Sequence, residues 1–198
     1  MKYYVTAAVG VIALAALAGL GSGERTQAAV TPAAAPVTEA AYPQRPLFGD
    51  THLHTANSFD AFTAGLRLGP EDALRFARGD AVMTASGIEA KLHRPLDFLV
   101  ITDHSDAIGT TAELYNTPED QITDPTLKRW RAMMHTGGGE AYKAFREMVT
   151  AFATGNVPPD FADPQRMREI ARRVWDGQLD AVERYNQPGK LTALIGFE

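Results

Sequence analysis

The sequence predicts an α/β domain built on a parallel sheet, and three observations lead to this prediction. The run Phe98 to Ile101 is apolar on both faces, as expected of a parallel strand that is covered on both sides. Segments with strand and helix patterns follow one another in the order strand, helix, strand, helices, strand. The composition, 45% hydrophobic and 22% charged, is that of an ordinary globular protein.

The first elements follow from local sequence features. The pattern of residues 47–55 approaches the alternation of a strand and predicts a short one. Pro70 suits the first position of a helix, the two acids after it complement the positive end of the helix dipole, and Gly79 is a suitable stop. Residues 96–102 contain the apolar run and form the second predicted strand.

A mostly helical insertion is predicted between the second and third strands. Residues 127–134 and 140–153 have helical spacing, and the glycines at 137–139 predict a flexible break between them. A longer helix is capped at Asp163 and Pro164 and reaches Tyr185. Residues 191–197 predict the third strand. Three strands cannot close a barrel, so we expect residues 47–198 to be an incomplete domain, the first part of a longer protein.

The amino-terminal segment predicts export. Residues 1–23 hold Lys2 followed by an uncharged, moderately apolar run, which fits either a cleaved signal peptide or an uncleaved membrane anchor. Residues 24–46 are an Ala/Pro-rich linker. Both interpretations place the rest of the chain outside the cytoplasm, in the periplasm or the extracellular space. Contact with a membrane is expected only through an uncleaved segment.

Charge and cysteine content narrow the function classes. The net charge is −5 and no basic stripe stands out, so nucleic acid is not an expected partner. The absence of cysteine excludes disulfides and thiolate zinc sites. A metal site in this chain must use imidazole and carboxylate ligands, which suit zinc, manganese or iron.

The first predicted strand carries a His-x-His motif. Residues two apart in a strand point to the same face, so His52 and His54 can place two imidazoles on one ion. Asp50 is a candidate acceptor for a second ring nitrogen. The alternative is a pair of ordinary surface histidines, and the motif alone does not decide between the two.

A second histidine follows the second predicted strand. Asp103 and His104 come directly after the buried run, and ligands of parallel α/β sheets gather at the carboxyl ends of strands. Core packing does not explain an ionisable pair at this position, so the metal interpretation is favoured. Asp103 is also a candidate for orienting a ligand. His93 and His135 are expected to be ordinary polar residues.

Three motifs carry a resemblance to a known superfamily. Residues 50–55, residues 101–104 and Gly196-Phe197-Glu198 resemble the metal-binding motifs of the polymerase and histidinol phosphatase (PHP) superfamily. The longer runs 48–62 and 94–109 resemble a PHP-like family of large, often exported bacterial proteins whose function is unknown. The resemblance is strong at the three motifs and weak across the helical insertion.

The resemblance implies a distorted (β/α)7 barrel, with this chain as its N-terminal part, and a site with two or three divalent ions. It implies that the enzyme hydrolyses small-molecule phosphate esters. Carried over by motif, His52 and His54 would bind one metal, Asp60 and His104 another, and Glu198 would bridge two. Phe59 places Asp60 one residue later than is usual, so a loop or helix-capping role for Asp60 stays open.

Two other functions remain possible interpretations of the sequence. An amidohydrolase also begins with a His-x-His motif on its first barrel strand. The third interpretation is a PHP-like module that has lost catalysis and serves as a binding or structural part of an envelope protein. The sequence identifies no catalytic residue apart from the metal-ligand candidates.

Overall fold

The computed structural model describes residues 44–198; the predicted targeting segment and nearly all of the linker lie outside this range. The strands are β1 (Gly49–Leu53), β2 (Val82–Met83), β3 (Glu89–Ala90), β4 (Phe98–Ile101) and β5 (Thr192–Ile195). The helices are α1 (Phe59–Thr63), α2 (Pro70–Ala77), α3 (Thr110–Asn116), the 3-10 helix η2 (Glu119–Gln121), α4 (Pro125–Thr136), α5 (Gly138–Thr154) and α6 (Pro164–Tyr185). The described part of the chain is therefore α/β, as predicted. None of its helices is long and apolar enough to span a bilayer.

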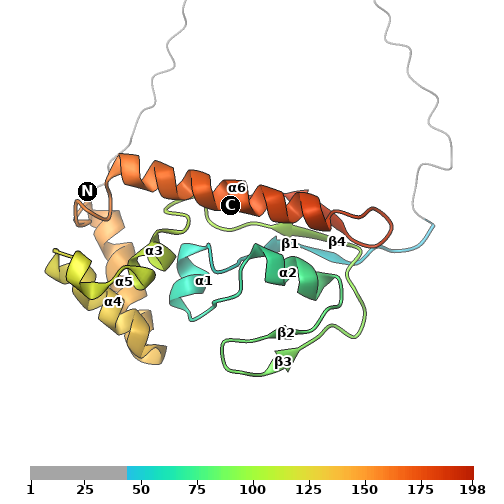
Figure 1. The fold of residues 1–198 in the computed structure, drawn as a ribbon, viewed down its shortest axis with the longest axis horizontal. Coiled ribbons are helices and arrows are strands. Elements are labelled where there is room, and N and C mark those ends of the chain that lie inside the picture. The colour runs from blue at the N-terminus through green and yellow to red at the C-terminus, as the bar shows by residue number, and fades with distance from the viewer. Residues whose placement is uncertain (1–43) are drawn as a thin grey trace, which may run out of the picture. The chain divides into compact units, whose positions relative to one another are not determined.

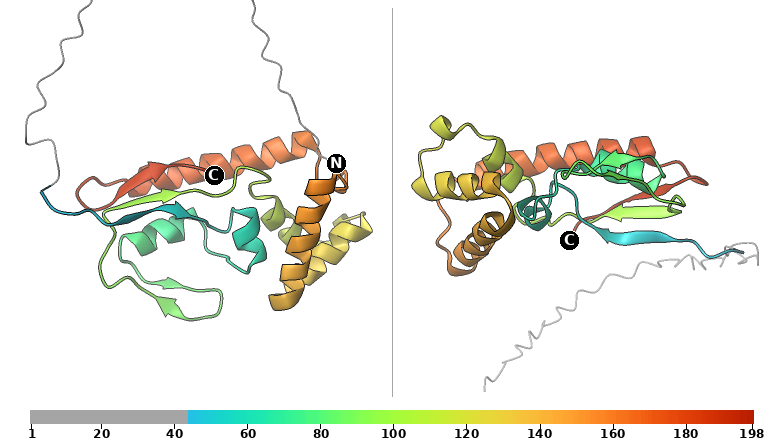
Figure 2. Two further views of the ribbon diagram at one scale, coloured as in Figure 1. Left: turned by 180° about the vertical axis from the view of Figure 1, so that it is seen from behind. Right: turned by 90° about the horizontal axis from the view of Figure 1, so that it is seen from below.

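Three strands form a parallel sheet in the order β1-β4-β5, with β4 in the centre (Figure 1). The prediction of a parallel sheet is therefore confirmed. Phe98 pairs with Gly49 on one side and with Thr192 on the other. Because the strands are parallel, their carboxyl ends lie at the same edge of the sheet (Figure 2, left). The short strands β2 and β3 form a separate antiparallel hairpin.

Two helices, α2 and α6, cover one face of this sheet (Figure 2, right). The apolar strand β4 supplies Leu99 and Ile101 to the core beneath them, and both are fully buried. Leu74 from α2 and Leu191 before β5 complete the centre of this core. Burying one such side chain stabilises the fold by about 1.5–3 kcal/mol. The core therefore holds β4 firmly under the two helices.

The predicted helical insertion is present between β4 and β5, and it has a core of its own. Trp130 of α4 and Met148 of α5 are buried there, together with Phe62 of α1. The Trp130 indole N–H donates to a Glu147 carboxylate oxygen at 2.9 Å. The predicted three-glycine break is shorter than expected. Gly137 alone separates α4 from α5, because its φ of 76° ends one helix and the next begins at once.

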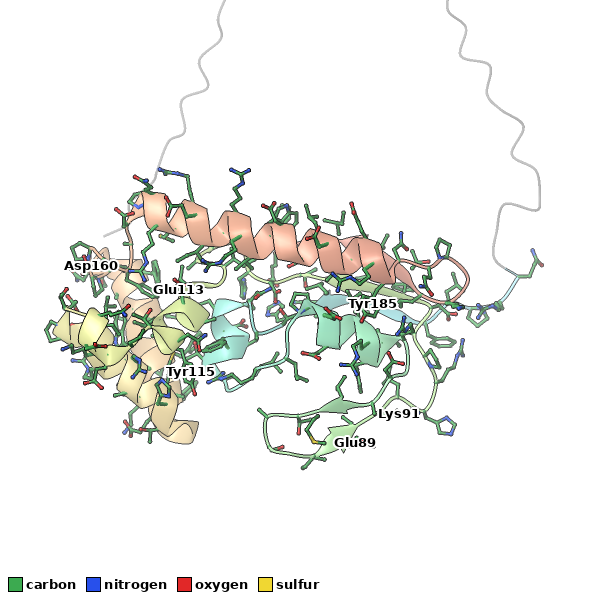
Figure 3. All side chains as sticks on the ribbon, in the orientation of Figure 1. Glu89, Lys91, Glu113, Tyr115, Asp160 and Tyr185 are labelled. Atoms are coloured by element: carbon green, nitrogen blue, oxygen red, sulfur yellow. The ribbon has the colours of Figure 1, made fainter. Side chains whose placement is uncertain are left out.

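Ionic and hydrogen-bonded contacts fix α6 to the elements beneath it (Figure 3). Arg173 pairs with Glu113 of α3 at 2.6 Å. Near the other end of α6, the Tyr185 hydroxyl donates to Glu71 of α2 at 3.0 Å, and Arg184 pairs with the same carboxylate at 3.0 Å. The helix is therefore tied both to the helical insertion and to the helix that covers the sheet.

The carboxylate of Asp97 joins the starts of β1 and β4, and its contribution to stability should depend on pH. It accepts the Phe48 N–H at 2.9 Å and pairs with Arg45 and Arg94 at 3.0 and 3.1 Å. The Phe48 hydrogen bond and the two guanidinium groups lower the pKa of Asp97. A lowered folded-state pKa stabilises the fold above the unfolded value, about 4, and this stabilisation is lost as the pH falls through the folded value.

We therefore expect Asp97→Asn to unfold at lower urea than the parent chain at pH 7, and to approach the parent below about pH 3. Urea midpoints measured between pH 3 and pH 7 check this. A gap between the two proteins that stays constant over the whole range would contradict the assignment.

Candidate metal centre

All five predicted ligands come together at the carboxyl edge of the sheet. His52 lies in β1 and His54 directly after it, while Asp60 is in the first turn of α1. His104 follows β4 by three residues, and Glu198 follows β5 by the same number. All three parallel strands therefore contribute to a single cluster.

One group of possible ligands consists of His52, His54 and Glu198. The Nε2 atoms of both histidines lie 2.9 Å from the same carboxylate oxygen, Oε2 of Glu198. Their rings are 5.1 Å apart between centroids. The side chains of His52 and Glu198 are exposed by 68% and 45%, against 17% for His54, so this group faces solvent while His54 lies at its base.

The second group consists of His54, Asp60 and His104. Nδ1 of His54 is 3.2 Å from Oδ2 of Asp60, and Nε2 of His104 is 3.6 Å from the same oxygen. The His54 and His104 rings meet edge to face at 4.7 Å. His54 therefore belongs to both groups, with a different nitrogen turned toward each carboxylate.

These distances fit a divalent ion. Around tetrahedral zinc, with bonds of about 2.0–2.2 Å, neighbouring ligand atoms are about 3.3–3.6 Å apart. The separations of 2.9 Å to Glu198 would have to widen by about half an ångström. Two imidazoles and one carboxylate, with room for a further ligand, are a donor set typical of catalytic zinc.

The charges around His54 favour a cation. Burial by itself lowers the pKa of His54, but the hydrogen bond to Glu198 and the charge of Asp60 outweigh it and raise that pKa. Burial acts to raise the pKa of Asp60, yet the hydrogen bonds from Ser58 and from the Ala61 N–H lower it overall. The hydrogen bond with His54 also lowers the pKa of Glu198. Both carboxylates therefore stay ionised and attract a positive charge to this place.

Asp103 is placed differently from the ligand candidates. Its carboxylate is fully buried and accepts the backbone N–H of Thr55 and, at 2.7 Å, the Thr55 hydroxyl. Burial raises the pKa of Asp103, and the two hydrogen bonds from Thr55 oppose that rise. Asp103 therefore joins the end of β4 to the end of β1.

Backbone hydrogen bonds hold the strand ends in register. The Thr102 N–H donates to Leu53 at 2.8 Å, which links β4 to β1 beyond their last pair. The Glu198 N–H donates to the backbone carbonyl of Asp103 at 3.2 Å, and the Ser105 N–H donates to the backbone carbonyl of Glu198 at 2.8 Å. The Glu198 backbone is therefore held against the segment that carries His104.

Steric crowding explains why the Gly-x-Glu motif begins with glycine. A Cβ atom on Gly196 would overlap a methyl group of Val100, which lies on the neighbouring strand. Only glycine therefore lets the end of β5 approach β4 this closely. This close approach places Glu198 next to the histidines of the other strands.

Two further sequence predictions concern residues that are not ligand candidates. The carboxylate of Asp50 accepts the backbone N–H of His52 at 2.9 Å, so the expected contact with a histidine ring is not what the structure shows. A two-residue separation favours this local bond, because the side chain reaches the backbone before it reaches a ring. The His135 ring stacks on the Tyr115 ring in the helical insertion, with 3.8 Å between the ring centroids.

Two residues that were not predicted as ligands support the cluster. Ser58 is fully buried, donates to Asp60 at 2.7 Å and accepts the His104 N–H at 3.2 Å. It therefore links the carboxylate after β1 to the histidine after β4. Gln178, from the middle of α6, donates to the backbone at the ends of β4 and β5. Ser58 lies within the run 48–62 that carries the resemblance, whereas Gln178 belongs to no recognisable motif and its partners are distant along the chain.

Comparison with known proteins identifies a family and nothing further. Residues 41–198 match the family described as "Protein of unknown function (DUF3604)". No curated protein and no solved structure matches this chain. The matched range spans the whole sheet, the helical insertion and all five residues of the cluster, and it covers well over half of the sequence. The chain therefore belongs to the DUF3604 family.

Proposed function

We propose that the cluster binds two divalent ions, zinc, manganese or iron, and that the protein is an exported metal-dependent hydrolase acting on small phosphate esters. The observation that carries this proposal is the convergence of three histidines and two carboxylates from the ends of all three parallel strands. Ligands of parallel α/β sheets bind at this edge, and ionisable groups with shifted pKa values that gather there mark a candidate functional site.

The contacts support a division of the cluster between two ions. The first ion would be bound by His52, by Nε2 of His54 and by Glu198. The second would be bound by His104 and Asp60. A neutral imidazole binds metal through one nitrogen and donates from the other. With Nε2 on an ion, Nδ1 of His54 therefore donates to Asp60, which lies 3.2 Å away.

The chemistry of such a pair suits phosphate esters. Bound divalent ions lower the pKa of a water ligand and neutralise charge on phosphoryl oxygens. The residues of the chain would position the ions: Ser58 and the Ala61 N–H hold Asp60, and the backbone bonds of the strand ends hold Glu198. The exposed side of the group, at His52 and Glu198, leaves access for a substrate.

We also propose that the α/β fold is part of a PHP-type barrel. The sheet face opposite α2 and α6 is apolar and partly exposed: it holds Phe98, Val100 and Leu194, and Leu194 is 45% accessible. In the described part of the chain, β1 and β5 each pair on one side only. An apolar face between open edges is what a barrel buries when further strands close it, and this supports the barrel over an open two-layer sheet.

Metal content and hydrolysis test the proposed function. We expect His52→Ala and His104→Ala each to lower the bound metal of the purified chain and to lower its hydrolysis of p-nitrophenyl phosphate and bis(p-nitrophenyl) phosphate. His93→Ala is the matched control, since His93 is exposed and precedes β4 instead of following it. Unchanged metal and activity in both cluster variants would refute the proposal. Hydrolysis of amides in place of phosphate esters would favour the amidohydrolase alternative.

A further inference from the structure

The side chain of Gln178 is the one polar group of α6 that is fully buried against the strand ends. Only 1% of Gln178 is exposed. Its Nε2 donates to the carbonyl of Gly196 at 3.1 Å and to the carbonyl of Ile101 at 3.4 Å. A single amide group therefore touches the backbone of both β4 and β5 where these strands end.

Burying the Gln178 amide is unfavourable unless its hydrogen bonds compensate. Its Oε1 atom has no hydrogen-bond partner among the described residues, and an unpaired buried acceptor is unfavourable. The orientation is set by the two carbonyls, since the reversed amide would point its oxygen at them. An apolar side chain of similar volume would fill the space without this cost. What the amide adds is the pair of hydrogen bonds to the strand ends.

Those two carbonyls mark the place where regular pairing stops. The last pair of the β4–β5 ladder is Ile101 with Ile195. The next backbone link is the bond from the Glu198 N–H to Asp103. Gln178 donates within the gap between them, and the residues just beyond the gap are the ligand candidates Glu198 and His104. The position of this amide therefore bears directly on how the two ligands face each other.

The helix that carries Gln178 is held on both sides of it. Arg173 binds Glu113 at 2.6 Å before Gln178, and Tyr185 binds Glu71 at 3.0 Å after it. Figure 3 shows Glu113, which lies on α3 beneath α6, well separated from Tyr185 at the end of α6. Because the helix is fixed at both places, its side chain can impose a position on the strand ends instead of following them.

We propose that Gln178 is a positioning residue of the metal centre, which clamps the ends of β4 and β5 to α6 and so sets the distance between His104 and Glu198. The metal-related part of this inference rests on the proposed function. The clamping of the strand ends does not, and it can be measured without any ion.

The test compares Gln178→Met with Val182→Ala in the full 198-residue chain. Methionine keeps the length of glutamine but removes the donor. Val182 is one turn further along α6, is 3% exposed and lies in the same core, so its truncation reports on lost packing alone. We expect Gln178→Met to lower the affinity for Zn²⁺ or Co²⁺ about 10–100-fold, as the loss of outer partners of metal ligands does, and to alter the Co²⁺ absorption spectrum. Val182→Ala should lower the urea midpoint and leave ion affinity within about threefold.

A second measurement separates this inference from the proposed function. Hydrogen exchange of the Glu198 and Ser105 amides, both bonded across the strand ends, should quicken in Gln178→Met and not in Val182→Ala. Gln178→Asn, whose shorter side chain cannot reach both carbonyls, should behave like the methionine variant if the latter folds poorly. Unchanged exchange at these amides would overturn the clamp, even in a chain that binds metal. Faster exchange in a chain that binds no ion would uphold the clamp and refute the metal centre.

Discussion

Replacing His54 with alanine is expected to weaken the binding of both ions, because it removes a ligand of the first and the hydrogen-bond donor to Asp60 at the second, whereas His52→Ala and His104→Ala should each affect only one. His54 belongs to both groups of possible ligands, with Nε2 facing Glu198 and Nδ1 facing Asp60. It is also the least exposed of the three cluster histidines, at 17%. Loss of an outer partner alone costs 10–100-fold in metal affinity, so loss of this central ligand should cost at least about 100-fold.

The stoichiometry of bound metal, measured after equilibration with Zn²⁺ and removal of free ion, decides this prediction. His135→Ala is a suitable control, because His135 stacks on Tyr115 in the helical insertion and should leave the stoichiometry unchanged. One ion retained by His54→Ala as tightly as by the parent chain would contradict the shared position of this residue. Loss of both ions from His52→Ala as well would show that the two sites fill only together.

The fold could be predicted from the sequence where burial leaves a simple pattern. Strand β4 is apolar at every position, because α2 and α6 cover one face and the other is partly buried. The long helices α4, α5 and α6 have apolar positions at helical spacing and proline near their first turns in two cases. Their boundaries are predicted within a few residues.

The short elements left no such pattern. Helix α1 has five residues and α3 has seven, which is too short for two full turns of periodicity. The hairpin of β2 and β3 has two residues in each strand, which is too short to show an alternating pattern of apolar and polar residues. These elements form because tertiary packing holds them: Phe62 of α1, for example, is buried in the core of the helical insertion.

The nearness of the three histidines could be predicted for a geometric reason, whereas Asp60 and Glu198 were predicted as ligands only from the family resemblance. Parallel strands bring their carboxyl ends together, so histidines after β1 and β4 must lie near each other whatever the intervening sequence is. The supporting residues were not predictable in this way. Thr55 binds Asp103 across 48 positions, and Gln178 binds Ile101 across 77. No local spacing rule connects residues so far apart, and a lone Ser, Thr or Gln is common on any surface.

Asp103→Ala is expected to be the most destabilising single change near the cluster, by about 3 kcal/mol in the free energy of unfolding, because it leaves two buried donors without a partner. The Thr55 N–H and hydroxyl both donate to this carboxylate, and Thr55 is only 1% exposed. Each unsatisfied buried donor costs about 1–3 kcal/mol. The change also removes the side-chain link between the ends of β1 and β4, so ion binding should weaken along with the fold.

Two further variants separate the lost hydrogen bonds from the lost charge. In Asp103→Asn the amide oxygen can still accept the Thr55 N–H, and the amide N–H can donate to the Thr55 hydroxyl oxygen. The free energy of unfolding should therefore fall by only about 1 kcal/mol. Asp106→Ala, three residues along the same loop and exposed, should stay within about 0.5 kcal/mol of the parent. Urea unfolding at pH 7 measures all three. Equal losses for Asp103→Ala and Asp103→Asn would mean that the negative charge of Asp103, and not its acceptor geometry, supports the strand ends.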